Sequence, residues 1–213
     1  MTASKHPPLP KRVVLKVKRI VRELDRGERE WIKAWPLIRP IEGWLHGGQE
    51  RWLFDRAREL SDGANIVEIG SYKGRSTCCL GFGCRGTRKR VYAVDRFDGG
   101  PDLPRIDSFD EFSRNVHSCG LSEYVVPVVG CSADVSKTWS KPIHFLFVDG
   151  SHEYQDVVTD FQGFLPHVVS GGLIAFHDVE HGWPGVLRAW NDIISHRLTG
   201  IGNCSTLAYG YKR

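Results

Sequence analysis

Between residues 48 and 213, short apolar runs alternate with segments in which apolar residues recur three or four positions apart. The short runs, rich in β-branched and aromatic residues, predict strands. The longer repeats predict the helices between them. We expect strands at about 65–69, 90–94, 124–129, 143–148, 172–176 and 206–211, and helices at about 48–60, from 76 onward, 109–119, 154–165 and 185–196.

This alternation of strands and helices predicts an α/β fold. Strands separated by helices favour a doubly wound, mostly parallel sheet with right-handed crossovers, and we expect seven strands in a Rossmann-like arrangement with an N-terminal helical arm. We divide the chain into residues 1–47, a basic arm with a Trp-rich cover segment, and residues 48–213, the domain that carries the sheet.

Charge is distributed unevenly between these two parts. Seven Lys and Arg residues and no acid precede Glu23, so a chain of net charge +4 leaves residues 23–213 at −3. Because the positive charge is confined to the arm, and no Asp/Asn-Pro-Pro-Tyr/Phe motif occurs, we expect no nucleic-acid partner.

Two segments of the arm leave alternatives open. Apolar residues at helical spacing over 11–24 predict an amphipathic helix that contacts a membrane surface or a partner, or packs on its own domain or a dimer mate. We favour packing over membrane contact, and we expect a homo-oligomer. The Trp-rich segment 31–46 either covers the functional site or joins the arm to the domain.

Composition bears on where in the cell we expect the protein to be located. Its 213 residues contain no apolar run long enough to span a membrane, and the N-terminus lacks the apolar core of a signal peptide. Six cysteines occur without a C-x-x-C pair, which favours reduced thiols over a zinc site. These features predict a cytoplasmic protein.

The segment 66–77 has the form of a nucleotide-binding unit, in which a buried strand ends in an acid, turns on a glycine and opens a helix. Its expected ligand contacts are Glu68, Gly70, Ser71, Gly74 and Ser76. The chain shows G-x-x-x-G rather than G-x-G-x-x-G, and Tyr72 stands where the middle glycine would be. A bulky side chain there disfavours a pyrophosphate.

Two carboxylates refine the expected ligand. Glu68 would repel phosphate, but it could order the turn or pair with an ammonium group. Asp95, about 25 residues after Gly70, lies where a carboxylate that binds ribose hydroxyls is expected. Together these features favour a nucleoside ligand that carries positive charge and no phosphate, and S-adenosylmethionine is such a ligand.

Two further strand ends carry polar groups. Asp149 and His152 follow one strand, and His177 and Asp178 follow the next. If these strands are neighbours, their ends lie about 5 Å apart. The carboxylates of Asp149 and Asp178 would then share a proton or bind a divalent cation such as Mg²⁺.

The two histidines have alternative roles. His152 could be a general base that accepts a proton from a substrate hydroxyl, or a histidine of a surface loop. His177 could be a nitrogen ligand of the metal, or a strand residue facing a helix. Asp149 could also be a cap of the following helix.

These motifs resemble those of class I S-adenosylmethionine-dependent methyltransferases. More narrowly, they are similar to small bacterial O-methyltransferases grouped with macrolide sugar O-methyltransferases. The resemblance is carried by Val67–Ser76, Val94-Asp95, Phe147–Tyr154 and Gly171–Asp178.

The resemblance implies a role for each matching residue. Glu68 and Gly70 would shape the methionine side of the cofactor pocket, Asp95 would bind ribose, and Ser132 would lie near adenine. Asp149 would bind metal beside the cofactor, and His152 would be the base. Metal-dependent relatives have Glu-Asp or Asp-Asn where this chain has His177-Asp178, so a softer ion, a weaker site or no metal remains open.

The sequence therefore predicts an S-adenosylmethionine-dependent O-methyltransferase that acts on a hydroxyl of a small molecule or sugar. Residues 96–108 and 31–46 are the expected walls of its acceptor pocket. A nicotinamide-dependent oxidoreductase is disfavoured because neither G-x-G-x-x-G nor Tyr-x-x-x-Lys is present. The other alternative is a methyltransferase-like cofactor-binding or scaffold protein without catalysis.

Overall fold

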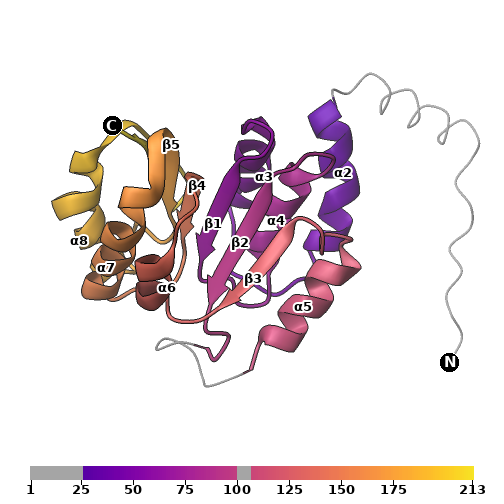
Figure 1. Cartoon of the computed structure of the whole chain (residues 1–213), viewed down its shortest axis with the longest axis horizontal. Coiled ribbons are helices and arrows are strands. Elements are labelled where there is room, and N and C mark those ends of the chain that lie inside the picture. Colours follow the sequence, from indigo (N-terminus) through magenta and orange to yellow (C-terminus); the bar gives the residue numbers. More distant parts are fainter. Residues whose placement is uncertain (1–25, 100–106) are drawn as a thin grey trace, which may run out of the picture.

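The computed structural model describes residues 26–99 and 107–213, which form one seven-stranded sheet between two layers of helices (Figure 1). The strand order is β3-β2-β1-β4-β5-β7-β6. Pairs from β3 through β5 are parallel, and β7 is antiparallel to both β5 and β6. The strands are β1 (Asn65–Ile69), β2 (Arg90–Asp95), β3 (Val125–Val129), β4 (Ile143–Val148), β5 (Val168–Phe176), β6 (Leu198–Cys204) and β7 (Leu207–Lys212). The predicted α/β fold is confirmed.

Helices cover both faces of the sheet (Figure 1). One face packs against α2 (Arg26–Ile38), α3 (Gln49–Glu59), α4 (Arg75–Cys84) and α5 (Phe109–Ser118). The other packs against α6 (Ser132–Thr138), α7 (Tyr154–Phe164) and α8 (Pro184–Ala189). Short turns of helix extend α7 and α8 at Leu165–His167, Trp190–Ile194 and Ser195–Arg197. Among the described residues, no helix is both long and apolar enough to cross a membrane.

The central strands are apolar on both sides because each side faces a helical layer. In β4, Phe145 and Phe147 join the core under α3 and α4, whereas Leu146 and Val148 join the core under α7 and α8. This alternation follows from the two-residue period of a strand. Val148 pairs with Phe176 of β5, so the residues that follow them, at positions 149 and 177, lie side by side.

The structure corrects several element boundaries. Strand β5 begins at Val168, four residues before the predicted start, and the predicted helix 185–196 is divided into α8 and two short turns of other helix types. We missed β6 because Gly200 and Gly202 interrupt its pattern and much of this edge strand is exposed. We missed α6 because its seven residues are mostly polar and give no helical repeat.

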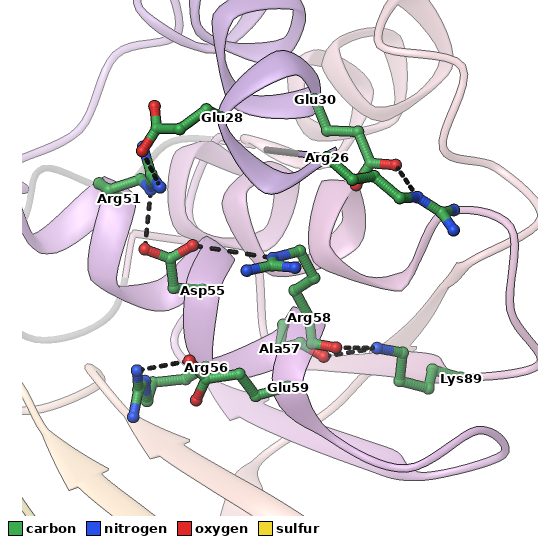
Figure 2. A network of polar contacts seen from close by, with 10 residues as sticks. All are labelled: Arg26, Glu28, Glu30, Arg51, Asp55, Arg56, Ala57, Arg58, Glu59 and Lys89. Carbon is green, nitrogen blue, oxygen red and sulfur yellow. Dashed lines mark hydrogen bonds and ion pairs between the residues drawn. The ribbon is translucent and has the colours of Figure 1, made fainter. Parts of the chain in front are cut away.

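Polar contacts attach α3 to its neighbours (Figure 2). Arg51 of α3 bonds Glu28 of α2 and Asp55 one turn further along α3, each at 2.7 Å. Lys89, 2 % exposed, donates to the carbonyl oxygens of Ala57 and Arg58 at the end of α3. An ammonium there satisfies carbonyls that have no partner inside the helix. These contacts fix α3, whose first residue, Gln49, contacts His177 at the end of β5. The helix predicted over 11–24 lies outside the described residues.

Candidate functional site

A cavity of about 870 Å³ opens at the carboxyl ends of the parallel strands. Strand order reverses between β1 and β4, and ligands of doubly wound sheets bind at such a switch point. Of the predicted site residues, the cavity lining includes Gly70, Ser71, Ser76, Asp95, Ser132, Asp149, His152, His177 and Asp178. Glu68 and Gly74 are not part of that lining.

The turn after β1 depends on Gly70. Its φ of 82° lies in the left-handed region, and an added Cβ would come within 2.1 Å of the carbonyl oxygen of Asp149. Its N–H donates to the carbonyl of Val94, while the Asp149 N–H donates to the carbonyl of Ile69. A glycine is therefore required where the β1 turn crosses the end of β4.

Glu68 lies behind the cavity wall. Its Oε2 accepts hydrogen bonds from the hydroxyls of Ser71, at 2.7 Å, and Thr77. The side chain is fully buried, and burial raises the pKa of Glu68 to about 7 against the opposing effect of these hydroxyls. Of the two roles that the sequence left open, this geometry favours ordering of the turn over direct pairing with a ligand.

Asp95, at the end of β2, is also engaged by backbone groups. Its Oδ2 accepts the N–H groups of Ser71 and Tyr72, at 2.6 and 2.8 Å, and its Oδ1 accepts the N–H of Phe97 at 2.7 Å. The carboxylate thus joins the two loops that follow β1 and β2. It lines the cavity, as a ribose contact would require, but the sequence did not predict this second role.

Ser132 lies at the start of α6 and donates its hydroxyl proton to Asp160 of α7. Asp160 is 5 % exposed, and burial raises its pKa to about 6 although the Ser132 hydroxyl opposes this shift. Both residues line the cavity. Sequence reasoning missed Asp160 because an acid inside a predicted helix normally lies on its exposed face. Its spacing of three and four positions from the apolar residues Val157 and Phe164 is the signal that could have placed it on the inner face.

Asp149 and His177 meet beyond the ends of β4 and β5. The Nδ1 atom of His177 is 3.0 Å from Asp149 Oδ1 and 3.0 Å from Asp178 Oδ2. The His177 side chain is 3 % exposed, yet its Nδ1 makes no well-aligned hydrogen bond. Nδ1 is therefore directed between the two carboxylates, and its contact with them is electrostatic.

His152 contacts the same carboxylate oxygen of Asp178 as His177 does. Its Nε2 is 3.0 Å from Asp178 Oδ2, and its ring stacks on Trp183 with the centroids 3.8 Å apart. Asp178 itself has a left-handed φ of 58°. Gly185 lets α8 approach this loop, because an added Cβ there would lie 2.2 Å from the carbonyl oxygen of His152.

The charges of this cluster are coupled. Burial by itself lowers the pKa of His177, but the carboxylates of Asp149 and Asp178 outweigh burial and raise it to about 10. Burial likewise would raise the pKa of Asp178, but the hydrogen bond with His152 and the positive charge of His177 hold it below its usual range. The chain alone therefore carries a positive His177 beside an ionised Asp178 at neutral pH.

The cluster also has donors that suit a divalent metal. Asp149, His152 and Asp178 each offer one ligand atom, and these atoms lie within 4.8 Å of one another. The buried Nδ1 of His177, without an aligned hydrogen bond, faces the same carboxylates. Two carboxylate oxygens with an imidazole nitrogen fit a first-row transition ion better than Mg²⁺, which prefers oxygen ligands throughout.

The expected acceptor walls are only partly as predicted. Trp44 and His46 line the cavity, whereas Trp31 and Trp35 pack against the core under α2 and α3. One part of the segment 31–46 thus covers the cavity, and another part packs against the domain. These correspond to the two roles that the sequence left open. In the predicted wall 96–108, the lining residues are Arg96, Asp98, Gly99 and Ser108. Residues 100–106 lie outside the described part of the chain.

Acidic groups outnumber basic ones around the cavity. Within the described residues its lining includes two arginines and the acids Glu42, Asp95, Asp98, Asp149, Asp156, Asp160, Asp178 and Glu180. Arg75 is paired with Glu50, and Arg96 with Asp98. A cavity of this composition attracts a cationic ligand and disfavours a phosphate.

Comparison with known proteins agrees with this geometry. Residues 67–179, more than half of the chain, match a family described as "Methyltransferase domain". The chain belongs to this methyltransferase family. The matched segment runs from β1 to the loop after β5, so it contains the Gly70 turn and the whole Asp149–Asp178 cluster. The predicted resemblance to class I methyltransferases is confirmed.

Solved structures of methyltransferases share the fold. The O-methyltransferase NovP has a TM-score of 0.67 and 16% identity, over 77% of this chain and 79% of NovP. An O-methyltransferase from Bacillus cereus in complex with SAH has a TM-score of 0.61 and 19% identity, over 92% of this chain and 97% of that one.

Two sequence relatives are uncharacterized. A protein of Sinorhizobium fredii is 26% identical over 176 residues, which are 74% of this chain and 18% of the relative. One of Acanthamoeba polyphaga mimivirus is 42% identical over 60 residues, which are 27% of each protein. The methyltransferase chain therefore spans less than a third of either relative.

Proposed function

We propose that this methyltransferase is an S-adenosylmethionine-dependent O-methyltransferase that acts on a hydroxyl of a small molecule or sugar. The observation that carries the proposal is the continuity of the cavity. One space extends from Ser132 and Asp160, past Gly70 and Asp95, to the cluster around His152. A nucleoside cofactor and an acceptor can therefore meet in it. The excess of acids supports a cofactor with a sulfonium charge.

The proposed chemistry assigns proton removal to His152. S-Adenosylmethionine, when bound, supplies an electrophilic methyl group. His152 donates its Nε2–H to Asp178, so the proton of the acceptor hydroxyl passes to Nδ1, and the Asp178 carboxylate stabilises the resulting imidazolium. Trp183 restrains the imidazole by stacking on it. Trp44 and Trp183, 58% and 38% exposed at the cavity, offer apolar faces to a sugar or another ring.

We further propose that Asp149, His177 and Asp178 hold a divalent cation. When bound, the cation would lower the pKa of the acceptor hydroxyl. His152 has a ligand atom within the same reach, and we assign it to proton transfer because its Nε2 is directed to Asp178. The homo-oligomer and the packed N-terminal helix stay predictions.

Calorimetric titration with S-adenosylmethionine and S-adenosylhomocysteine tests the cofactor assignment. We expect micromolar binding in EDTA, and release of S-adenosylhomocysteine when a panel of sugars and polyhydroxylated natural products is added with Mg²⁺ or Mn²⁺. Absence of binding under every condition would contradict the proposal. Binding without turnover over the whole panel would favour a cofactor-binding protein without catalysis.

A further inference from the structure

Gln49, which no sequence motif singled out, contacts the buried edge of the reactive cluster. It is the first residue of α3, is fully buried, and lies 128 positions from His177 in the chain. Its Oε1 is 3.1 Å from His177 Nε2. It therefore touches the imidazole on the side opposite to the carboxylates of Asp149 and Asp178.

The orientation of the Gln49 amide is determined from both of its ends. Its Nε2 donates to Thr206 Oγ1 at 2.9 Å and, more weakly, to the carbonyl oxygen of Cys204 at 3.5 Å. Its Oε1 accepts the backbone N–H of His46 at 2.8 Å. A carbonyl oxygen can only accept a hydrogen bond, and a backbone N–H can only donate one. Exchanging the amide oxygen and nitrogen of Gln49 would therefore break its bonds to the Cys204 carbonyl and to the His46 N–H.

This orientation requires that Nε2 of His177 carries hydrogen. Because Gln49 presents an oxygen, His177 Nε2 must be the donor. Nδ1 is then the nitrogen that faces the carboxylates, 3.0 Å from one oxygen of each. In the chain alone a proton on Nδ1 supplies the positive charge between them, and a metal ion that replaced this proton would be bound by the Nδ1 lone pair.

We propose that Gln49 is a positioning residue that keeps His177 in the Nε2–H form, so that Nδ1 joins Asp149 and Asp178 in binding a first-row divalent transition ion in preference to Mg²⁺. The proposal rests on the metal site of the proposed function. A metal-bound histidine usually donates its other N–H to an oxygen of the protein, and that outer contact fixes the ring and supports affinity. A nitrogen donor shifts preference away from Mg²⁺.

The test titrates the full-length protein with Co²⁺ and with Mg²⁺, in parallel with S-adenosylhomocysteine. Co²⁺ binding is followed by calorimetry and by visible absorption, which reports the coordination of the ion without any turnover. We expect the wild type to bind Co²⁺ at least tenfold more tightly than Mg²⁺. Gln49→Met, which removes the acceptor but keeps the volume, should lose about 10–100-fold in Co²⁺ affinity and leave S-adenosylhomocysteine affinity unchanged.

Two matched variants separate the His177 contact from packing. Gln49→Glu keeps an oxygen toward His177 and should retain Co²⁺ affinity within a few-fold. Thr206→Val removes the partner of the Gln49 amide nitrogen, leaves the bond to His177, and should have a smaller effect than Gln49→Met. Nitrogen-15 NMR of the wild type, with a His177→Gln spectrum for assignment, should show hydrogen on Nε2 of His177 whether or not Gln49→Met folds.

Three results would overturn the proposal: equal Co²⁺ and Mg²⁺ affinities in the wild type, Co²⁺ affinity unchanged by Gln49→Met, or a His177 that carries hydrogen only on Nδ1. A wild type that binds S-adenosylhomocysteine but no Co²⁺ overturns it while leaving the methyltransferase proposal intact. A wild type that binds Co²⁺ as expected but not S-adenosylhomocysteine would instead contradict the cofactor assignment.

Discussion

Around Gly70 the cavity is shaped by backbone atoms, whereas around His177 it is shaped by side chains that carry charge. At the first end, Asp95 accepts backbone N–H groups and the buried Glu68 accepts hydroxyls. At the second end, the imidazoles of His177 and His152 both contact the carboxylate of Asp178. A backbone-built end gives a fixed shape, which suits an invariant cofactor. A charged end can exchange protons, which suits a reaction.

The largest effect is expected from a substitution at the end of the cavity that is shaped by backbone atoms. Gly70→Ala would require a left-handed φ and would place a Cβ against the Asp149 carbonyl. We expect cofactor affinity to fall by more than 100-fold, with a Tm loss larger than that of Gly63→Ala. The control also has a positive φ, 78°, but no atom within 4 Å. It should lose about 1–3 kcal/mol from strain alone. Equal behaviour of the two variants would show that the turn does not depend on its approach to β4.

The second prediction tests the charged end. His152→Ala should lower turnover by about 10²–10⁴-fold, because the general base is lost, and should leave cofactor affinity nearly unchanged. Steady-state kinetics and calorimetry measure the two quantities. His181→Ala is a suitable control, since His181 is exposed and outside the cavity lining. Loss of cofactor binding in His152→Ala would indicate a structural role instead.

The third prediction concerns a titrating acid at the end of the cavity formed by Ser132 and Asp160. Asp160 has a folded pKa of about 6 against an ordinary value of 3.8. The folded state therefore keeps a proton that the unfolded state loses, so stability falls as pH rises from about 4 to about 6. Over that window the unfolding free energy of the wild type should fall by about 3 kcal/mol relative to Asp160→Asn.

Denaturant unfolding at several pH values measures this difference. Glu153→Gln, at an exposed position just before the same helix, should show no comparable change. A pH-independent difference between the wild type and Asp160→Asn would mean that Asp160 stays ionised. The part of the cavity around Asp160 would then carry a buried negative charge, as the cluster around Asp178 does.

Local pattern predicted much of this arrangement. The six strands proposed from apolar runs are present, and the residues after the five parallel strands β1 to β5 line one cavity. Asp149 and Asp178 could be placed there because parallel strands end at the same edge of a sheet. The pattern failed for β6, where Gly200 and Gly202 interrupt an exposed edge strand, and the register of β6 with β7 stabilises a segment that has little strand character of its own.

The sequence by itself determined the order of elements, the Gly70 turn and the types of side chain at the strand ends, because these depend on neighbours a few residues away. Only the tertiary structure decided which groups touch. Gln49 reaches His177 across 128 positions, and Asp160 reaches Ser132 across 28. Those contacts depend on how α3 and α7 pack on opposite faces of the sheet. The resulting burial and charge coupling set the His177 and Asp160 protonation states, which no local spacing records.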